Sequence, residues 1–406
     1  MPACQTQAAA NSPRAVLAIN GGSSSIKFAL FDVTAAPQRR LWGSIDRIGL
    51  GDGTFRATDA RTNETVRSEL AAAGHAEAVE HLVGWLESRF DLSSLAAIGH
   101  RIVHGGPKLI DPCWIDAGVL DELRRMAPFD PEHLPGEIEL IEAFTKATPH
   151  APQAACFDTA FHKDLPQVAK LLAIPRKYAQ RGIHRYGFHG LSYSFLMDEL
   201  SRLDPRAAEW RVVLAHLGNG ASMAAVRGGK CVDTTMAFTP TAGLVMSTRS
   251  GDFDPGLVRY LIEEERLSAA EFHDLVNRRS GLLGISETSS DMRDLLASRA
   301  GDTRAAEAVA LFCYQAKKTI GSFAAALEGI DALVFSGGIG ENAAEVRAMI
   351  CKGLDFLGVV LDGPRNEAGQ PVISADGSQV AIHVIRTDEE VTIARIVTQL
   401  LSARRV

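Results

Sequence analysis

"AINGGSSSIKFALFD", residues 18–32, sets two glycines and three serines between two apolar runs and then supplies a lysine. The apolar run 15–19 is typical of a buried strand. Ile26, Phe28 and Leu30 alternate with other residues, which predicts a second strand. Because Asn-Gly is a strong hairpin signal, the stretch predicts strand–turn–strand. A P-loop is strand–loop–helix and ends in Gly-Lys-Ser/Thr, so this stretch is not one.

The middle of the chain repeats this arrangement. Residues 211–217 form an apolar run, residues 218–220 (Gly-Asn-Gly) a tight turn, and residues 221–227 a further strand. Residues 230–233 predict a third strand after a Gly-Gly turn. The repeat indicates two related α/β halves, with helices expected in the segments between the strands: 75–90, 135–145, 192–201, 255–265, 303–327 and 390–403.

A third glycine-rich stretch, "SGGIGENA" (336–343), follows a predicted strand at 331–335 and precedes a predicted helix at 342–354. Gly338-x-Gly340, with Ala343 and with Asp362 further on, fits the pattern of a dinucleotide-binding turn. The same geometry suits an adenine nucleotide at a helix start. Both interpretations stay open on these residues alone.

Composition narrows the class of protein. The chain has 406 residues, a net charge of −7 and a hydrophobic content of 46%, which is ordinary for a soluble globular protein. The acidic balance argues against nucleic acid or a membrane surface as the main partner. The six cysteines are scattered without a C-x-x-C pair, as in reduced intracellular proteins. We expect residues 1–13 to be a disordered tail and the location to be cytoplasmic.

Several residues are candidates for holding an anion. Glycine loops can bring consecutive N–H groups to a phosphate, and the first loop adds serines and Lys27, although a plain hairpin remains the alternative. Arg101, after an apolar strand, can clamp a carboxylate or phosphate or form a surface ion pair. His189 is a candidate donor or a buried structural histidine. Arg249 lies in the long loop 238–256, and loops of such length are often functional.

Carboxylates supply the other candidates. Asp158 could orient a nucleophile, cap a helix or pair with an arginine. Asp291 could cap a helix, with Arg293 near a ligand or on the surface. Glu389 suits a helix start or a divalent cation, and Mg²⁺ usually takes one or two protein carboxylates beside water and phosphate oxygens.

Nine motifs occur together in an order that resembles the acetate kinase family, which includes propionate and butyrate kinases. They are "INGGSSSIKF", "GHRIVHGG", "FDTAFH", "YGFHG", "HLGNGAS", "FTPTAGLVMSTRSGDFDPG", "SGLLGIS", "DMRDL" and "SGGIGENA". The resemblance runs from about residue 15 to the C-terminus.

The resemblance implies the α/β fold of the sugar kinase, Hsp70 and actin superfamily: two ribonuclease-H-like domains with mixed sheets, and an active site in the cleft. The implied domains are 14–160 with 390–406, and 161–389. It also implies a homodimer that depends on Mg²⁺, with Mn²⁺ as the alternative to Mg²⁺, and that interconverts ATP and a short carboxylate with ADP and an acyl phosphate. No nucleic acid or membrane partner is expected.

The family's functional residues map onto this chain motif by motif. The implied catalytic residues are Asp158, His189 and Arg249, and the implied metal-site residues are Asn20 and Glu389. The implied carboxylate site contains Arg101, Val103, Phe188 and Pro240. The implied phosphate and nucleotide groups are Ser23, Ser25, Lys27, His216, Leu217, Gly218, Asn219, Gly220, Asp291, Met292, Arg293, Gly338, Ile339, Gly340, Glu341 and Asn342.

Some positions depart from the family pattern. Where the family reads Ala-Pro-Leu-His-Asn-Pro, this chain reads Ala-Pro-Phe129-Asp130-Pro, and the nearby histidine is His133.

The carboxylate substrate is ionised near neutral pH, so the reaction needs no general base. We therefore expect Asp158 to orient an arginine or metal-bound water, although the family label for it is proton donor and acceptor.

The leading function is a short-chain carboxylate kinase acting on acetate. Two alternatives are a propionate- or butyrate-preferring kinase and a superfamily ATPase without acyl transfer. A nicotinamide-dependent oxidoreductase built on Gly338-x-Gly340 is a further one.

Overall fold

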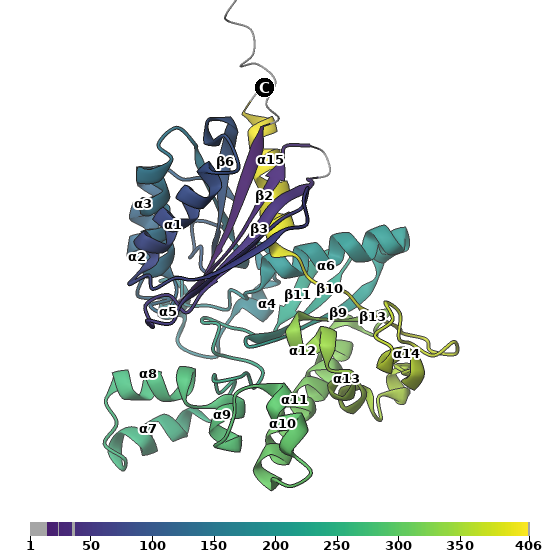
Figure 1. Ribbon diagram of the computed structural model, residues 1–406. Coiled ribbons are helices and arrows are strands. Elements are labelled where there is room, and N and C mark those ends of the chain that lie inside the picture. Colours follow the sequence, from purple (N-terminus) through teal and green to yellow (C-terminus); the bar gives the residue numbers. More distant parts are fainter. Residues whose placement is uncertain (1–13, 23, 35–36, 405–406) are drawn as a thin grey trace, which may run out of the picture. The chain divides into compact units, whose positions relative to one another are not determined.

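The computed structural model describes residues 14–22, 24–34 and 37–404. The predicted tail, 1–13, lies outside these residues. The chain forms two compact units (Figure 1), unit 1 from Met1–Ala160 with Asp388–Val406 and unit 2 from Phe161–Thr387. The last helix thus joins the first unit. Asp388 and Glu389 belong to unit 1, where their side chains bond to Arg39 and Asn20.

Unit 1 contains a mixed sheet in the order β5-β4-β3-β2-β1-β6-β8-β7. The opening stretch forms the predicted antiparallel hairpin, in which Asn20 lies opposite Lys27. β1 is parallel to β6, and β6 to β8. The strands are β1 (Ala15–Gly21), β2 (Ser25–Asp32), β3 (Arg39–Asp46), β4 (Thr54–Asp59), β5 (Thr65–Glu69), β6 (Leu95–Ile102), β7 (Cys113–Trp114) and β8 (Gln153–Phe157).

Helices cover the two faces of this sheet, so the central strand β1 is almost wholly buried. On one face, α1 (His75–Glu87) and α3 (Leu134–Ala147) pack Leu82 and Phe144 against Leu17 and Phe28. On the other face, α15 (Glu389–Ala403) lies so close that a Cβ at Gly99 would meet Ile393 at 2.4 Å. Residues of β1 and β6 therefore alternate between the two helical layers.

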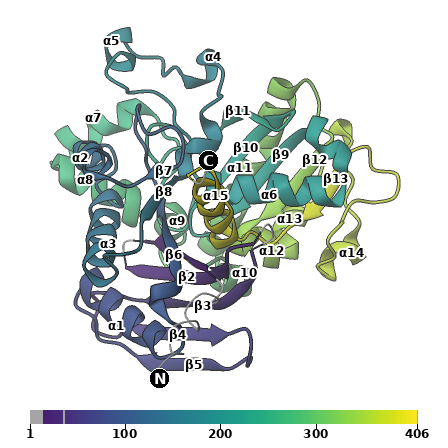
Figure 2. The ribbon, with the colours of Figure 1, turned by 90° about the horizontal axis from the view of Figure 1, so that it is seen from above.

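Unit 2 repeats the central part of this topology. Its sheet runs β11-β10-β9-β12-β13 (Figure 2), with β9 antiparallel to β10 and parallel to β12. This order matches β3-β2-β1-β6-β8 of unit 1, which confirms the predicted duplication and the two mixed α/β sheets. The strands are β9 (Arg211–Leu217), β10 (Ala221–Arg227), β11 (Lys230–Thr234), β12 (Ala332–Ser336) and β13 (Ala381–Val384).

The helix α6 (Gly190–Leu203) covers one face of this second sheet, packing Leu196 and Leu200 against Val212 and Leu214. On unit 2, α6 holds the position that α15 holds on unit 1. The long helix α11 (Thr303–Leu327) begins and ends where the sequence predicts. At its start the side chain of Asp302 accepts hydrogen bonds from the first backbone N–H groups, and at its end Glu328 adopts the left-handed conformation.

The remaining helices are shorter connections. They are α2 (Ala117–Met126), α4 (Gln167–Lys170), α5 (Arg176–Ala179), α7 (Pro255–Glu263), α8 (Ala269–Arg278), α9 (Gly281–Ser286), α10 (Met292–Ser298), α12 (Gly337–Asn342), α13 (Ala344–Cys351) and α14 (Gly363–Glu367), with 3-10 turns at Leu92–Ser94, Asp158–His162, Pro205–Glu209 and Asp355–Leu357.

The third glycine-rich stretch differs from its predicted form. We expected a turn at 336–340 and one helix at 342–354, but the chain enters α12 directly at Gly337 and restarts as α13. Gly337 has a φ of +77° and closely approaches the carbonyl of Leu217, a position that favours glycine. Asp362 caps α14 by accepting from the backbone N–H of Arg365 at 2.8 Å, which gives it a structural role.

Candidate functional site

Four predicted residues of unit 1 meet at the carboxyl end of its parallel strands. Asn20 lies near the end of β1, Arg101 near the end of β6, and Asp158 follows β8. Strand alternation turns Asn20 and Arg101 toward the face that α15 covers, and Glu389 begins that helix. We call these four residues the Arg101 cluster. Open α/β sheets bind ligands at this edge.

Hydrogen bonds hold the Arg101 cluster together. Arg101 donates from Nη2 and Nε to Oδ2 of Asp158, at 2.6 and 3.1 Å, and from Nη1 to Oδ1 of Asn20 at 3.4 Å. Asn20 donates from Nδ2 to Oε2 of Glu389 at 2.8 Å and to Oε1 of Glu390 at 3.3 Å. Asp158 is thus an ion-pair partner of Arg101, one of the roles the sequence left open.

Burial and neighbouring charges shift the pKa of Glu389, Glu390 and Arg101. Burial raises the pKa of Glu389, against the opposing charge of Arg101, and burial together with Glu389 raises the pKa of Glu390. Burial opposes the charge of Arg101, but Asp158 and Glu389 raise its pKa overall. Burial therefore disfavours the charged forms of Glu389 and Glu390, and the charge of Arg101 opposes this effect at Glu389.

The donor set fits a hard divalent cation. Asp158 is fully buried, and its Oδ1 has no hydrogen-bond partner among the described residues. No group of three or more His, Cys, Asp or Glu in the described part of the chain could hold a metal ion. Mg²⁺ needs only one or two protein carboxylates, because water and phosphate oxygens complete its shell. The oxygens of Asn20 and Glu389, and the unpartnered Oδ1, suit that chemistry.

The first glycine loop closes the β1–β2 hairpin above this cluster. Gly22 donates its N–H to the carbonyl of Ser25 at 2.8 Å. Lys27 is exposed on β2, opposite Asn20, and its charge acts on Glu389. The predicted Ser23 lies outside the described residues. The loop is thus a hairpin that also brings a cation to the acidic cluster.

The segment after Arg101 includes the predicted Val103, which is buried. Its N–H donates to both carboxylate oxygens of Glu137 at 3.1 Å. Burial raises the pKa of Glu137 well above its usual value, against the opposing charge of Arg101. In the departure from the family pattern, the buried Asp130 bonds to Nδ1 of His133 at 2.8 Å.

A second group of predicted residues meets at the corresponding place in unit 2. The hairpin β9–β10 turns at Gly218, Asn219 and Gly220, and His216 at the end of β9 lies opposite Ser222. His189 caps α6 in the left-handed conformation, with a φ of +59°. The rings of His189 and His216 stack at 4.3 Å between centroids. We call His189, His216 and Arg249, with the Gly218–Gly220 turn, the two-histidine cluster.

Two nitrogen atoms of this cluster converge on one glycine. A Cβ built at Gly220 would lie 3.2 Å from Nε2 of His189 and 3.5 Å from Nη1 of Arg249. Arg249 also donates from Nη1 to the carbonyl of Pro240 at 3.2 Å. Three basic side chains beside backbone N–H groups form an arrangement that favours a phosphate.

The predicted nucleotide segments lie in two places in unit 2. Gly338 adjoins the second hairpin turn, since its backbone N lies 3.6 Å from a Cβ built at Gly218. Glu341 accepts from the N–H groups of Gly337 and Thr387 at 2.9 and 3.2 Å, and Asn342 donates to the carbonyl of Gly338. These bonds join α12 and the segment before α15.

The other predicted nucleotide segment is the start of α10. Asp291 caps this helix, accepting from the N–H of Arg293 at 2.8 Å, and pairs with the exposed Arg293 side chain. Met292 is buried beside them. The cap was one of the predicted alternatives. In the predicted acyl pocket, Phe188 and Pro240 are also buried in unit 2.

Some residues of these clusters were not predicted. Ser192 bonds to His216, Ser222 bonds to His189, and Tyr193 bonds to Ser222. Glu390 accepts from Asn20, and Glu137 accepts from the N–H of Val103. Of these residues, Ser222 alone lies inside one of the nine motifs quoted above, and nothing in the spacing marked it as a partner of histidine. Such pairs form by strand register and helix packing, which sequence order alone does not show.

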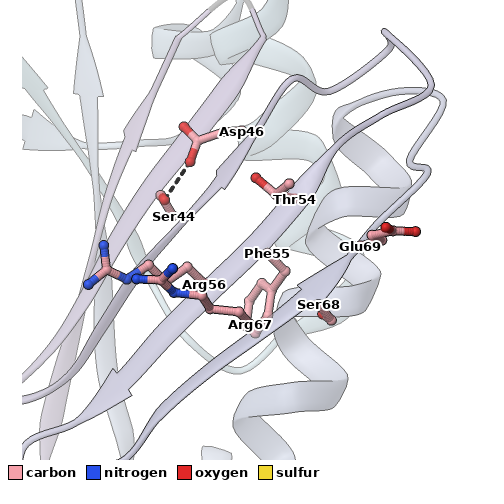
Figure 3. Close-up of a pocket in the computed structure, with 8 residues that line it drawn as sticks. All are labelled: Ser44, Asp46, Thr54, Phe55, Arg56, Arg67, Ser68 and Glu69. Atoms are coloured by element: carbon pink, nitrogen blue, oxygen red, sulfur yellow. Dashed lines mark hydrogen bonds between the residues drawn. The ribbon is translucent and has the colours of Figure 1, made fainter.

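A pocket of about 520 Å³ lies elsewhere, over β3, β4 and β5 of unit 1 (Figure 3). Figure 3 shows Arg56 and Arg67 close to each other, with Ser44 donating to Asp46 at 2.6 Å. The pocket contains none of the predicted residues and remains without an assigned ligand.

Comparisons with known proteins point to one family. The family model described as "Acetokinase family" matches residues 15–395. A curated acetate kinase of Rhodopseudomonas palustris is 44% identical over 397 residues, which is 96% of this chain and 99% of that protein.

Solved structures agree. An acetate kinase of Porphyromonas gingivalis is 35% identical with a TM-score of 0.86, covering 96% of this chain and 100% of that one. A propionate kinase of Francisella tularensis is 34% identical with a TM-score of 0.89, covering 94% of this chain and 98% of that one.

None of the helices formed by residues 14–22, 24–34 and 37–404 has the length and apolar character that a membrane span requires.

Proposed function

The chain belongs to the acetokinase family, and on that premise we propose that it transfers the γ-phosphoryl group of ATP reversibly to acetate, giving acetyl phosphate and ADP. It is an enzyme, a phosphotransferase with a carboxyl group as acceptor. The family implies ATP or ADP as substrate and a divalent metal ion. We propose Mg²⁺ as that ion.

One observation carries the proposal: Nε2 of His189 and Nη1 of Arg249 converge on Gly220 in the two-histidine cluster. Phosphoryl transfer spreads negative charge over three equatorial oxygens, so fixed donors around one point lower its barrier. Gly220 leaves space for a ligand at this point, whereas a side chain at position 220 would crowd His189 and Arg249. We assign His189 and Arg249 to stabilising that charge, and the backbone of the Gly218–Gly220 turn to the phosphates.

The acceptor carboxylate fits the Arg101 cluster. A guanidinium binds a carboxylate through two parallel N–H donors, and Arg101 is held on one side by Asp158. The carboxylate oxygen attacks the γ-phosphorus, the bond to the β-γ bridging oxygen breaks, and ADP leaves with that oxygen. Because the nucleophile is already ionised, Asp158 serves to orient Arg101 and no proton is removed.

We propose that Asn20 and Glu389 form the metal site, with Oδ1 of Asp158 available to a metal-bound water. A bound divalent cation would neutralise phosphate charge and orient the γ-phosphate. Oδ1 of Asp158 is buried, and the half-buried side chains of Asn20 and Glu389 lie within 2.8 Å of each other. Ser23, Ser25 and Lys27 are proposed phosphate-loop groups, and Asp291, Met292, Arg293 and the segment Gly338–Asn342 are proposed nucleotide contacts.

Acetate is the proposed substrate because the curated relative is an acetate kinase. A propionate-preferring enzyme is the alternative, since one structural relative carries that name. We propose that Val103, Phe188 and Pro240 limit the acyl chain. All three are buried, so their volume decides how much chain can enter.

We also propose a homodimer. The helices α7 and α8 bury none of their residues, and Leu257, Tyr260 and Ile262 expose 43%, 55% and 41% of their surface. Exposed apolar residues gathered on one helix mark an interaction surface. A Tyr260→Glu variant should shift the chain to monomer in light scattering. An unchanged mass would reject this surface as the interface.

The five described cysteines are all unbridged, which supports a cytoplasmic location.

A hydroxamate assay for acyl phosphate tests the function directly, with ATP, Mg²⁺ and each of acetate, propionate and butyrate. We expect product with all three acids and the highest kcat/KM for acetate. A higher kcat/KM for propionate or butyrate would favour the alternative kinase. ADP release at the same rate with and without the three acids, and with no acyl phosphate formed, would favour an ATPase and reject the proposal.

A further inference from the structure

Two neighbouring residues of α6 reach the two stacked histidines of unit 2. Ser192 and Tyr193 lie in the first turn of α6, and both are fully buried. They face β9 and β10, where His216 and Ser222 are direct register partners on one face of the sheet. Each α6 residue starts a separate chain of hydrogen bonds to one histidine.

The chain that starts at Tyr193 ends on His189. The Tyr193 hydroxyl bonds to Oγ of Ser222, and that oxygen lies 2.8 Å from Nδ1 of His189. Tyr193 cannot move easily, because its ring packs against Phe161 and His162 at 5.6 and 5.7 Å between centroids. The hydroxyl position is therefore fixed by aromatic packing.

The other chain ends on His216. Oγ of Ser192 lies 2.8 Å from Nδ1 of His216 and 2.8 Å from Oγ1 of Thr387. In both chains a serine hydroxyl contacts the Nδ1 atom. The Nε2 atoms are the ones nearest the glycine turn, at 3.2 Å from a Gly220 Cβ for His189 and 4.0 Å from a Gly218 Cβ for His216.

The direction of the first chain follows from acidity. A phenol is a stronger donor than an alkyl hydroxyl, so Tyr193 donates to Ser222, and Ser222 in turn donates to Nδ1 of His189. A neutral imidazole that accepts at Nδ1 carries its proton on Nε2. That nitrogen is the one beside Arg249 at Gly220.

We propose that Tyr193 and Ser222 are positioning residues that fix the orientation and the Nε2–H tautomer of His189, so that it can donate to the transferring phosphoryl group. The proposal rests on the proposed function for its kinetic effect. The left-handed backbone at His189 is costly for a residue other than glycine and must be held by surrounding contacts. The hydrogen bonds between Tyr193 and Ser222 and between Ser222 and His189 provide some of these contacts.

The first test measures the NMR signals of the ring nitrogens in the wild-type protein and does not depend on catalysis. In ¹⁵N-labelled protein, the His189 ring should show a protonated Nε2 and an unprotonated, hydrogen-bonded Nδ1. A His189→Gln variant assigns the signal. A ring protonated at Nδ1, or one that exchanges between both tautomers, would overturn the proposal, whatever reaction the protein catalyses.

The second test compares Tyr193→Phe and Ser222→Ala in the assay of acyl phosphate formation. We expect kcat to fall about 10-fold for Tyr193→Phe and about 100-fold for Ser222→Ala, with KM changing less than twofold. Because the two residues act in series, the double variant should be no slower than Ser222→Ala alone. Multiplied losses in the double variant would contradict the chain.

Tyr186→Phe is the matched control. It removes another buried phenol of unit 2, one whose hydroxyl donates to the carbonyl of Gly182 at 2.7 Å. We expect wild-type kcat and an unchanged His189 spectrum. A Tyr193→Phe variant that keeps both the wild-type kcat and the wild-type His189 tautomer would refute the positioning role.

Discussion

Replacing His100 by glutamine should reduce the loss in the free energy of unfolding of unit 1 as the pH falls from 7 to 4.5. His100 lies on β6 and is 2% exposed. Its Nε2 bonds to Oε1 of Gln153 at 2.6 Å, and its ring packs edge-on to Phe144. A glutamine amide can keep a donor near that position but does not titrate in this range.

The magnitude follows from the shift in pKa. Burial lowers the pKa of His100 from 6.5 to about 4, against the hydrogen bond to Gln153. Between these values the unfolded chain binds the proton and the folded chain does not, so the free energy of unfolding rises with pH. The contribution of His100 to the free energy of unfolding is fully present above about pH 6.5 and is lost as the pH falls toward 4. From pH 7 to pH 4.5 the loss is about 2.4 kcal/mol, from 1.36 kcal/mol per pKa unit.

Urea unfolding measures this difference. The chain has four tryptophans, of which Trp210 alone belongs to unit 2. In a Trp210→Phe background, fluorescence therefore reports unit 1. The advantage of the parent protein over His100→Gln should shrink by about 2.4 kcal/mol between pH 7 and pH 4.5. Subtracting the two curves removes the contribution of every other titrating group.

Phe144→Leu provides the control, because it weakens the same packing without removing a titrating group. It should lower stability by about 1 kcal/mol at every pH and keep the parent slope. A difference between parent and His100→Gln that stays constant within about 0.5 kcal/mol across this range would refute the reasoning.

The remaining predictions concern the two clusters. Arg249→Ala should lower kcat by about 10³-fold with an unchanged circular dichroism spectrum, and a near-normal kcat would remove Arg249 from the mechanism. Glu389→Gln should raise the Mg²⁺ concentration for half-maximal activity at least about 10-fold, whereas an unchanged Mg²⁺ titration would place the metal elsewhere. Gly220→Ala should lower kcat/KM about 10-fold, because the added methyl group lies 3.2 Å from Nε2 of His189, while the melting temperature stays near that of the parent. Full activity in that variant would show that the space at Gly220 is not used.

The hairpins could be predicted because their signals are local. Asn-Gly and Gly-Asn-Gly turns between alternating apolar runs specify β1–β2 and β9–β10 whatever surrounds them. The same holds for α11, whose Asp302 cap and apolar period fix both ends. The glycine-rich turn before α12 was predicted wrongly, because its close approach to Leu217 is a tertiary contact.

The repeated α/β halves, the anion-binding residue types and the family could all be inferred from the amino-acid sequence, because turn chemistry, periodicity and ordered motifs are local properties of the chain. Which side chains contact one another became clear from the folded structure. Strand register sets Asn20 beside Arg101 and His216 beside Ser222. Helices distant in sequence then place Glu389 and His189 at the carboxyl ends of those strands. The physical reason is that burial and register act between segments far apart in the chain, where no local signal reaches.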